Sequence, residues 1–376
     1  MNRSFCTIVS SNYLAQAEVL INSFKIHHPN DDFHLLILDI IEIKRSPANK
    51  LKIWAPEEIG INPSSLNRMR QYYDVVEFAT SLKPFFLNHL LDIGSTEVTY
   101  LDPDIKIFAH IDSSIETSSG STISLTPHRL TPPSSLELGE SEREFLKYGT
   151  FNLGFISILE SENSRNFLKW WQTHLVTDSR RRPISELFTD QKWIDLVPSY
   201  FHYNKVRDYG FNVAPWNLDE RCLSYIDGRI VAGKHDLKFV HFSQISSLLK
   251  IGDLSKAWRL KLSNSGLTEE TRINFESLTR EYSLELKGTH SQLLVPGSYV
   301  KAKYPFSKAN YLLRDKIQKR ISDNEIGSRR LPCFSQKYIS KTLNFLAKLD
   351  SFNGLVWGIK SDIARIQMKM KNSKLG

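Results

Sequence analysis

The first 41 residues alternate between two apolar patterns, and this alternation limits the folds that the chain can adopt. Residues 5–10 form a mainly apolar run typical of a buried strand. The apolar side chains that follow recur at spacings of three, four and three, which predicts a helix packed on a sheet; they are Leu14, Ala17, Ile21 and Phe24. A second strand is predicted over residues 34–41, ending near Asp39. Strands that alternate with helices predict an α/β fold with a mainly parallel sheet, whose carboxyl edge is where ligands bind.

Later segments continue the alternation. The further predicted strands are residues 75–78, 122–125, 151–159 and 239–242. One helix is predicted to start at Lys83-Pro84, because Thr80 and Ser81 can cap it and proline suits its first turn. Another is predicted over residues 164–175, with aromatic residues on a broad apolar face.

Length and composition indicate a globular chain in two parts. The 376 residues exceed one compact core, so we expect a main α/β domain over residues 1–260 and a helical, basic region over residues 261–376. No apolar run reaches the roughly 20 residues that cross a bilayer, and the chain starts without a signal-peptide pattern. Its three cysteines fit no paired metal-binding spacing, which favours reduced thiols in a cytoplasmic protein.

The basic charge belongs to the last part of the chain. Residues 301–376 carry 17 Lys and Arg against 5 Asp and Glu, whereas residues 1–300 carry 32 against 36. An apolar stripe accompanies this charge; its members are Ile359, Ile363, Ile366 and Met370. The tail either contacts an anionic membrane, where each Lys or Arg contributes about 1 kcal/mol, or caps the main domain with its charges in water. Nucleic-acid binding is disfavoured because no recognisable motif accompanies the charge.

Asp102-Pro103-Asp104 follows directly on a predicted buried strand, residues 98–101. Two carboxylates one residue apart at the end of a strand can hold a divalent cation such as Mg²⁺ or Mn²⁺ through oxygen ligands. The alternative is a polar turn in which Pro103 ends the strand. The choice between the two depends on the segments that accompany the motif.

Six short segments with polar or charged residues follow one another along the chain. They are Ser11-Asn12-Tyr13, Leu82-Lys83-Pro84, Tyr100-Leu101-Asp102-Pro103-Asp104, Phe151-Asn152-Leu153-Gly154-Phe155, Asp190-Gln191 and Val240-His241-Phe242-Ser243. In this order and at these separations they resemble the GT-A glycosyltransferases, and most closely the bacterial polysaccharide-cluster type related to the glycogenin and lipooligosaccharide galactosyltransferase group. The resemblance covers residues 4–246 and continues weakly through Tyr304-Pro305-Phe306 to Arg320.

The resemblance implies a Rossmann-like GT-A fold in residues 1–260 and a metal-dependent hexosyltransferase activity. The donor is expected to be a nucleotide sugar, with a UDP-sugar favoured, and the acceptor a bacterial surface glycan or a lipid-linked glycan. Retention of the anomeric configuration and dependence on Mn²⁺ or Mg²⁺ are also implied. A metal ion neutralises the diphosphate leaving group as a Lewis acid, which is why such a site needs oxygen ligands.

The resemblance also assigns site residues. The implied metal ligands are Asp102, Asp104 and His241. The nucleotide and its phosphates are expected beside Ser11, Asn12, Tyr13, Asp39, Lys83, Asp102, His241 and Ser243. The donor sugar is expected near Asn152 and Gly154, and Trp216 and Asn217 are expected at the edge of the acceptor or the donor. The catalytic positions are Asp190, Gln191 and Asn152, where a carboxylate can stabilise an oxocarbenium-like state or take the acceptor proton.

Most of these residues also have a structural alternative. Asn12 suits a helix cap, Lys83 a solvated surface, and Trp216 a core position in the aromatic and amide-rich stretch 211–218. A histidine at a strand end, such as His241, is often structural. Asp190 can equally belong to the first turn of a capped helix.

Two further classes compete with the glycosyltransferase hypothesis. A sugar nucleotidyltransferase is disfavoured because residues 10–14 contain no glycine for a phosphate-binding turn. A non-catalytic glycan-binding or scaffold protein of a polysaccharide assembly system is the alternative, which the intact Asp102, Asp104 and His241 argue against. One departure stands out: Gln244 occupies a position where many members of the group have glycine, which brings a side chain close to the expected diphosphate.

Overall fold

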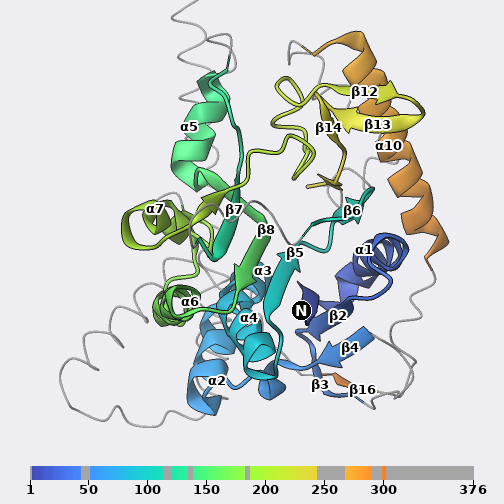
Figure 1. Cartoon of the computed structure of the whole chain (residues 1–376). Helices are drawn as coiled ribbons and strands as arrows, with labels where there is room; N and C mark the ends of the chain where they lie inside the picture. The colour runs from blue at the N-terminus through green and yellow to red at the C-terminus, as the bar shows by residue number, and fades with distance from the viewer. Residues whose placement is uncertain are drawn as a thin grey trace, which may run out of the picture. The chain divides into compact units, whose positions relative to one another are not determined.

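A seven-stranded sheet forms the centre of the protein (Figure 1). The computed structural model describes residues 2–43, 51–112, 121–133, 139–182, 187–243, 267–289 and 299–301. The strands lie in the order β11-β7-β8-β5-β1-β2-β4. Their bounds are Arg3–Val9 (β1), Asp32–Ile37 (β2), Leu51–Trp54 (β4), Glu97–Leu101 (β5), Ile123–Pro127 (β7), Phe151–Leu159 (β8) and Asn204–Lys205 (β11).

The sheet is mainly parallel. β1 pairs in parallel with both β2 and β5, so that Cys6 lies opposite His34 on one side and Tyr100 on the other. β4 and β11 also join their neighbours in parallel. Within this sheet, only β8 runs against the strands beside it, β5 and β7. The predicted α/β class with a mainly parallel sheet is therefore confirmed.

The strand order reverses between β1 and β5. From β1 the chain proceeds outward through β2 to β4, and then returns to form β5 on the other side of β1. At such a reversal the loops after the two strands diverge and leave a crevice outside their carboxyl ends. Ser11–Tyr13, the short 3-10 helix η1, follows β1, and Asp102 follows β5. The topology thus brings two of the predicted motifs to the place where an α/β sheet binds ligands.

Helices cover both faces of the sheet. Their bounds are Leu14–His27 (α1), Pro63–Tyr72 (α2), Val75–Ser81 (α3), Lys83–Asp92 (α4), Gly139–Tyr148 (α5), Glu162–Leu175 (α6), Val197–Tyr200 (α7) and Glu269–Gly288 (α10), with the 3-10 helices Pro56–Glu58 (η2) and Lys192–Leu196 (η4). α1 lies on one side of β1 and β5, and α3, α4 and α6 lie on the other (Figure 1). The predicted apolar stripe of α1 is buried and packs with Phe5 and Val9 of β1.

Short strands complete the fold. They are Ile40–Ile43 (β3) with Tyr299–Lys301 (β16), Ile105–Ile107 (β6) with Phe239–His241 (β15), Arg181–Arg182 (β9) with Leu187–Phe188 (β10), and the hairpin set Leu223–Ile226 (β12), Arg229–Ala232 (β13) and His235–Asp236 (β14). β15 pairs antiparallel with β6, which puts His241 opposite Ile105. The amide of Phe242 donates to the carbonyl of Asp104 over 2.9 Å. A distant part of the chain is thereby fixed beside the Asp-Pro-Asp motif.

α10 packs into a second core cluster. Phe275, Leu278 and Tyr282 of this helix are buried together with Phe242 and Val19. The ring of Tyr282 stacks on that of Phe242 at 4.1 Å. Contacts group Met1–Met69 with Val75–Tyr304 in one unit, and Arg70–Asp74 with Pro305–Gly376 in another. The expected boundary at residue 260 and the tail after residue 304 lie outside the described residues, so the predicted domain division stays a prediction.

The strand predicted over residues 75–78 is wrong, because this segment begins the helix α3. Val75 and Val76 are exposed, whereas Glu77 and Phe78 are buried. β-branched residues favour strands, but the burial of the next two side chains against the rest of the fold outweighs this weak preference. The buried carboxylate of Glu77 accepts a hydrogen bond from the amide of Arg181, which helps to fix the helix.

The predicted cap of the following helix is also wrong. Thr80 and Ser81 lie inside α3, where their hydroxyls donate to carbonyls of the same helix. Leu82 occupies the cap position of α4 and has no side-chain capping bond. The proline in the first turn, Pro84, is confirmed.

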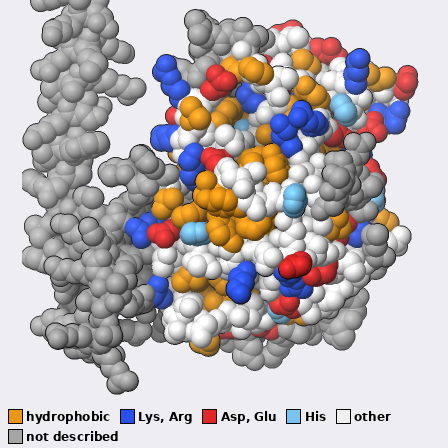
Figure 2. Space-filling model, turned by 60° about the vertical axis from the view of Figure 1, so that its left-hand side comes forward, with side chains coloured by type: hydrophobic (Ala, Val, Ile, Leu, Met, Phe, Trp, Pro, Cys, Tyr) orange, Lys and Arg blue, Asp and Glu red, His pale blue; other side chains and the backbone are white. Residues whose placement is uncertain are grey.

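The surface carries both signs of charge. Figure 2 shows the molecule turned so that the left-hand side of Figure 1 comes forward. On this face, hydrophobic side chains gather among charged ones. Leu196 and Tyr200, in η4 and α7, are among the exposed apolar residues. None of the helices in the described part of the chain has the length and apolar character that a bilayer crossing requires.

Candidate functional site

Asp102, Asp104 and His241 form one cluster at the carboxyl edge of the sheet. The Nε2 atom of His241 lies 3.1 Å from an oxygen of Asp104 and 3.7 Å from an oxygen of Asp102. One possible ligand atom from each residue lies within 4.8 Å of the others. His241 is buried, while both aspartates are partly open to solvent. The structure therefore assembles the three predicted metal ligands.

The charge and chemistry of this cluster fit a divalent cation. Burial lowers the pKa of His241, but the carboxylates of Asp104 and Asp102 outweigh burial and raise it above its usual value. The same negative field attracts a metal ion. Carboxylate oxygens suit Mg²⁺ and Mn²⁺, and an imidazole nitrogen beside them favours the transition metal. These residues could hold Mn²⁺ through Asp102, Asp104 and His241.

Strand β8 presses closely against the cluster at Gly154. The carbonyl of Gly154 accepts a hydrogen bond from the amide of Asp102 over 2.8 Å. A Cβ atom at this position would lie 2.6 Å from the Cε1 and Nδ1 atoms of His241, which is too close for any side chain. A glycine within a strand often marks the close approach of another group, and here that group is His241.

Asn152 also contacts His241. Its Oδ1 atom lies 3.2 Å from Nδ1 of His241 and accepts from the amide of Gly154. Its Nδ2 atom lies 3.2 Å from Nε2 of His128. The side chain is thus surrounded by partners within the protein, and the expected contact with a donor sugar stays a prediction.

Asn212 is a site residue that the sequence did not identify. It is fully buried, and its Oδ1 atom lies 3.2 Å from Nδ1 of His241. Its backbone has φ +52°, a left-handed conformation that asparagine tolerates better than most residues. The only sequence signal is an asparagine within an otherwise apolar stretch.

Lys83 and Asp190 form a buried ion pair next to the cluster. The ammonium of Lys83 lies 3.0 Å from Asp190 and 3.5 Å from Asp102, and it donates to the carbonyl of Leu153 over 2.9 Å. Burial opposes its charge, but the two carboxylates prevail and raise the pKa of Lys83. Lys83 is therefore no solvated surface lysine. It connects the predicted catalytic carboxylate to the predicted metal ligands.

The segment around Asp190 is strained and tightly held. Thr189 has φ +49°, which is uncommon for a β-branched residue, and strained conformations of this kind cluster at functional sites. Burial raises the pKa of Asp190, and Lys83 opposes this shift. The side chain of Gln191 accepts from the amide of Leu153 and donates to the carbonyl of Tyr148, so it braces β8.

The predicted nucleotide residues meet at the ends of β1 and β2. The amide of Ser11 donates to Asp39 over 2.9 Å, and the hydroxyl of Ser11 donates to the other oxygen of the same carboxylate. Asn12 is exposed and accepts from Ser10, so it caps no helix. Tyr13 is partly buried and packs against the core that holds Phe5, Val9 and the apolar side chains of α1.

Trp216 approaches the cluster from a separate loop. Its ring meets that of His241 edge to face at 5.4 Å. Its buried Nε1 atom has no hydrogen-bond partner among the described residues, which is uncommon for a buried donor. Asn217 is fully buried and closes the turn by accepting from the amide of Ala214. Ser243 is partly buried just after β15.

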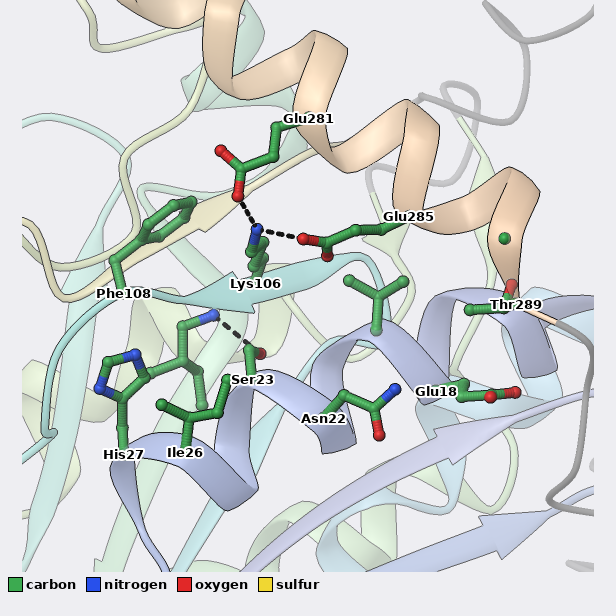
Figure 3. Close-up of a pocket in the computed structure, with 13 residues that line it drawn as sticks. Glu18, Asn22, Ser23, Ile26, His27, Lys106, Phe108, Glu281, Glu285 and Thr289 are labelled. Carbon is green, nitrogen blue, oxygen red and sulfur yellow. Dashed lines mark hydrogen bonds and ion pairs between the residues drawn. The ribbon is translucent and has the colours of Figure 1, made fainter.

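A groove of about 570 Å³ lies elsewhere, between α1, β6 and α10. Lys106 reaches across it to Glu281 and Glu285, as Figure 3 shows. None of the cluster residues lines it. The groove is therefore separate from the candidate metal cluster, which lies at the carboxyl edge of the sheet.

Comparisons with known proteins give distant likenesses. No protein-family model matches the chain. Two Bacillus subtilis (strain 168) proteins are similar in sequence. Uncharacterized protein YfnF is 26% identical over 274 residues, which are 70% of this chain and 88% of YfnF. Uncharacterized protein YfnD is 23% identical over 301 residues, which are 75% of this chain and 88% of YfnD.

Solved structures to which the chain is similar are glycosyltransferases. The galactosyltransferase LgtC, in complex with donor and acceptor sugar analogs, is 15% identical with a TM-score of 0.45, covering 78% of this chain and 98% of LgtC. Mouse xyloside xylosyltransferase 1 is 12% identical with a TM-score of 0.37, covering 65% of this chain and 99% of that protein. A glycosyltransferase involved in the glycosylation of the major capsid of PBCV-1 is 11% identical with a TM-score of 0.38, covering 67% of this chain and 100% of that protein.

Proposed function

We propose that this protein is a metal-dependent glycosyltransferase that moves a hexose from a nucleotide sugar, with a UDP-sugar as the expected donor, to a bacterial surface glycan or a lipid-linked acceptor. One observation carries the proposal: Asp102, Asp104 and His241 converge at the point where the strand order reverses. An α/β sheet binds ligands at such a point, and this donor set suits a cation that accompanies a diphosphate.

Separate groups of residues would bind the metal ion, the nucleoside and the donor sugar. Asp102, Asp104 and His241 would hold Mn²⁺ or Mg²⁺, which supplies Lewis-acid neutralisation of the departing diphosphate. Ser11 and Asp39, joined at the ends of β1 and β2, would receive the nucleoside. The unpartnered Nε1 of Trp216 would donate a hydrogen bond to the nucleotide sugar.

Asp190 is the proposed catalytic carboxylate. Its side chain is 2% exposed and is fixed by the ion pair with Lys83. A carboxylate held in this way can stabilise the positive charge that develops at the anomeric carbon, or accept the proton of the acceptor hydroxyl. Gln191 and Asn152 would keep β8 and His241 in place around it. Retention of configuration is part of the proposal.

A screen of nucleotide sugars tests the function. UDP-, GDP- and dTDP-sugars are added with and without Mn²⁺, and thermal unfolding is followed. A ligand that binds only the native state raises the melting temperature, so the UDP-sugars are expected to do so in the presence of Mn²⁺. Release of UDP by the wild type and its loss in Asp190→Asn would then separate catalysis from glycan binding alone. If no nucleotide sugar changes the melting temperature under any condition, the proposal fails.

A further inference from the structure

His241 lies in a buried polar network whose hydrogen bonds have only one consistent direction. The backbone amide of Gly154 can only donate, and it lies 3.0 Å from one side-chain atom of Asn152. That atom is therefore the acceptor Oδ1, and Nδ2 of Asn152 points toward His128. A backbone donor thus fixes the orientation of the Asn152 amide.

The orientation of Asn212 follows from that of Asn152. Nδ2 of Asn212 lies 3.0 Å from Oδ1 of Asn152 and 2.9 Å from the hydroxyl of Thr126. Thr126 in turn donates to the carbonyl of Asn152 over 3.2 Å, so its oxygen is free to accept. Both hydrogens of Asn212 are engaged, and its Oδ1 faces His241.

Two acceptor oxygens therefore converge on the same nitrogen of His241. Oδ1 of Asn152 and Oδ1 of Asn212 each lie 3.2 Å from Nδ1. Neither oxygen can donate, so both favour a proton on Nδ1, while the carboxylate of Asp104, 3.1 Å from Nε2, favours a second proton there. When the ring loses that second proton, the Nε2 lone pair faces Asp104 and Nδ1 keeps its hydrogen bonds to the two amides.

We propose that Asn212 and Asn152 are positioning residues that set the tautomer of His241 and aim its Nε2 lone pair at the space shared with Asp102 and Asp104. The inference rests on the proposed metal site. A metal-binding histidine commonly donates its other N–H to a carbonyl or carboxylate, which orients the ring and increases its basicity. Here two side-chain amides perform that task.

The backbone of Asn212 supports the inference. A buried asparagine at φ +52° stores strain that glycine would relieve. Glycine would provide the same turn, but it would remove the oxygen that faces His241. The residue type is thus explained by its side chain rather than by its backbone.

The tautomer can be measured without a metal. In protein labelled with ¹⁵N-histidine, two-bond ¹H–¹⁵N spectra of the metal-free, neutral ring report which nitrogen carries the proton, and a His241→Gln variant identifies the signals. The proton is expected on Nδ1. A proton on Nε2 would overturn the inference even if the proposed function is correct.

The effect on metal binding is measured with Asn212→Gly in the full chain. Loss of the oriented partner is expected to raise the Mn²⁺ dissociation constant about 10- to 100-fold, while the cooperative unfolding transition is retained. Asp227→Gly is the matched control, because Asp227 has φ +50° in an exposed turn away from the cluster. Unchanged Mn²⁺ affinity in Asn212→Gly would overturn the inference. Absence of Mn²⁺ binding by the wild type would remove the proposed metal site, and the inference with it.

Discussion

Gly154 sets the distance between β8 and His241. A methyl group at this position would lie 2.6 Å from the imidazole ring, which also meets the ring of Trp216 edge to face at 5.4 Å. Gly154→Ala is therefore expected to displace His241, to weaken Mn²⁺ binding at least tenfold, and to lower the free energy of unfolding by about 1–3 kcal/mol. Gly288→Ala is the control, since a Cβ there meets nothing within 4 Å. Wild-type metal affinity in Gly154→Ala would show that the ring is not held as described.

The raised pKa of His241 predicts a pH dependence of metal binding. A proton on Nε2 competes with the metal ion. The carboxylates of Asp104 and Asp102 stabilise that proton and raise the pKa of His241 above its ordinary value of 6.5. Mn²⁺ affinity should therefore rise with pH and level off above the raised pKa of His241. Below that pKa it is expected to fall about tenfold for each pH unit, because one proton is displaced per ion. Dissociation constants between pH 6 and 8 test this, and a flat profile would contradict it.

At the scale of elements, α10 is expected to be part of the fold's core rather than a loose addition. Phe275 is fully buried in the second core cluster, whereas Ile273 on the same helix is 54% exposed. Phe275→Ala should lower the free energy of unfolding by about 3–5 kcal/mol, as for other buried aromatic residues. Ile273→Ala should change it by less than about 0.5 kcal/mol. Urea unfolding compares the two, and equal small effects would show that α10 is not packed as described.

Long apolar runs were predicted well from the sequence, and the short elements were not. β1, β8, α1 and α6 have buried patterns long enough to indicate their type. The predicted strand over residues 34–41 is instead β2, a turn and the start of β3, because a short apolar run does not reveal where pairing changes. β4 was missed, although its Trp54 donates to His34 on the neighbouring strand. Packing partners that are distant in sequence decide such elements.

The candidate site was predictable only in part, for the same reason. Two carboxylates at a strand end indicated Asp102 and Asp104, and the resemblance to the GT-A group implied His241; the structure brings the three together. The sequence could not show that Lys83 is buried between two carboxylates, because its partners lie far away in the chain. Asn212 was missed because its role depends on a left-handed backbone and on a histidine 29 positions later.

At the scale of the whole molecule, the basic tail either contacts an anionic membrane or caps the main domain, and an experiment on vesicles separates the two. Residues 301–376 carry 12 more basic than acidic residues, and their structure lies outside the described part. Replacing Lys360, Arg365, Lys369 and Lys371 with glutamine in the full chain should reduce sedimentation with anionic vesicles, since each basic residue near the surface contributes about 1 kcal/mol. Donor-dependent thermal stabilisation should persist in this variant. Equal sedimentation of both proteins would refute the membrane role.

One measurement tests whether the carboxylate cluster at the strand reversal holds the metal ion that the diphosphate needs. Isothermal calorimetry of UDP binding, with and without Mn²⁺, compares the wild type with the Asp102→Ala, Asp104→Ala double variant, while circular dichroism checks that both are folded. We predict Mn²⁺-dependent UDP binding in the wild type and its loss in a folded double variant, because the carboxylates hold the ion that the diphosphate needs. Undiminished Mn²⁺-dependent binding by the double variant would contradict the account.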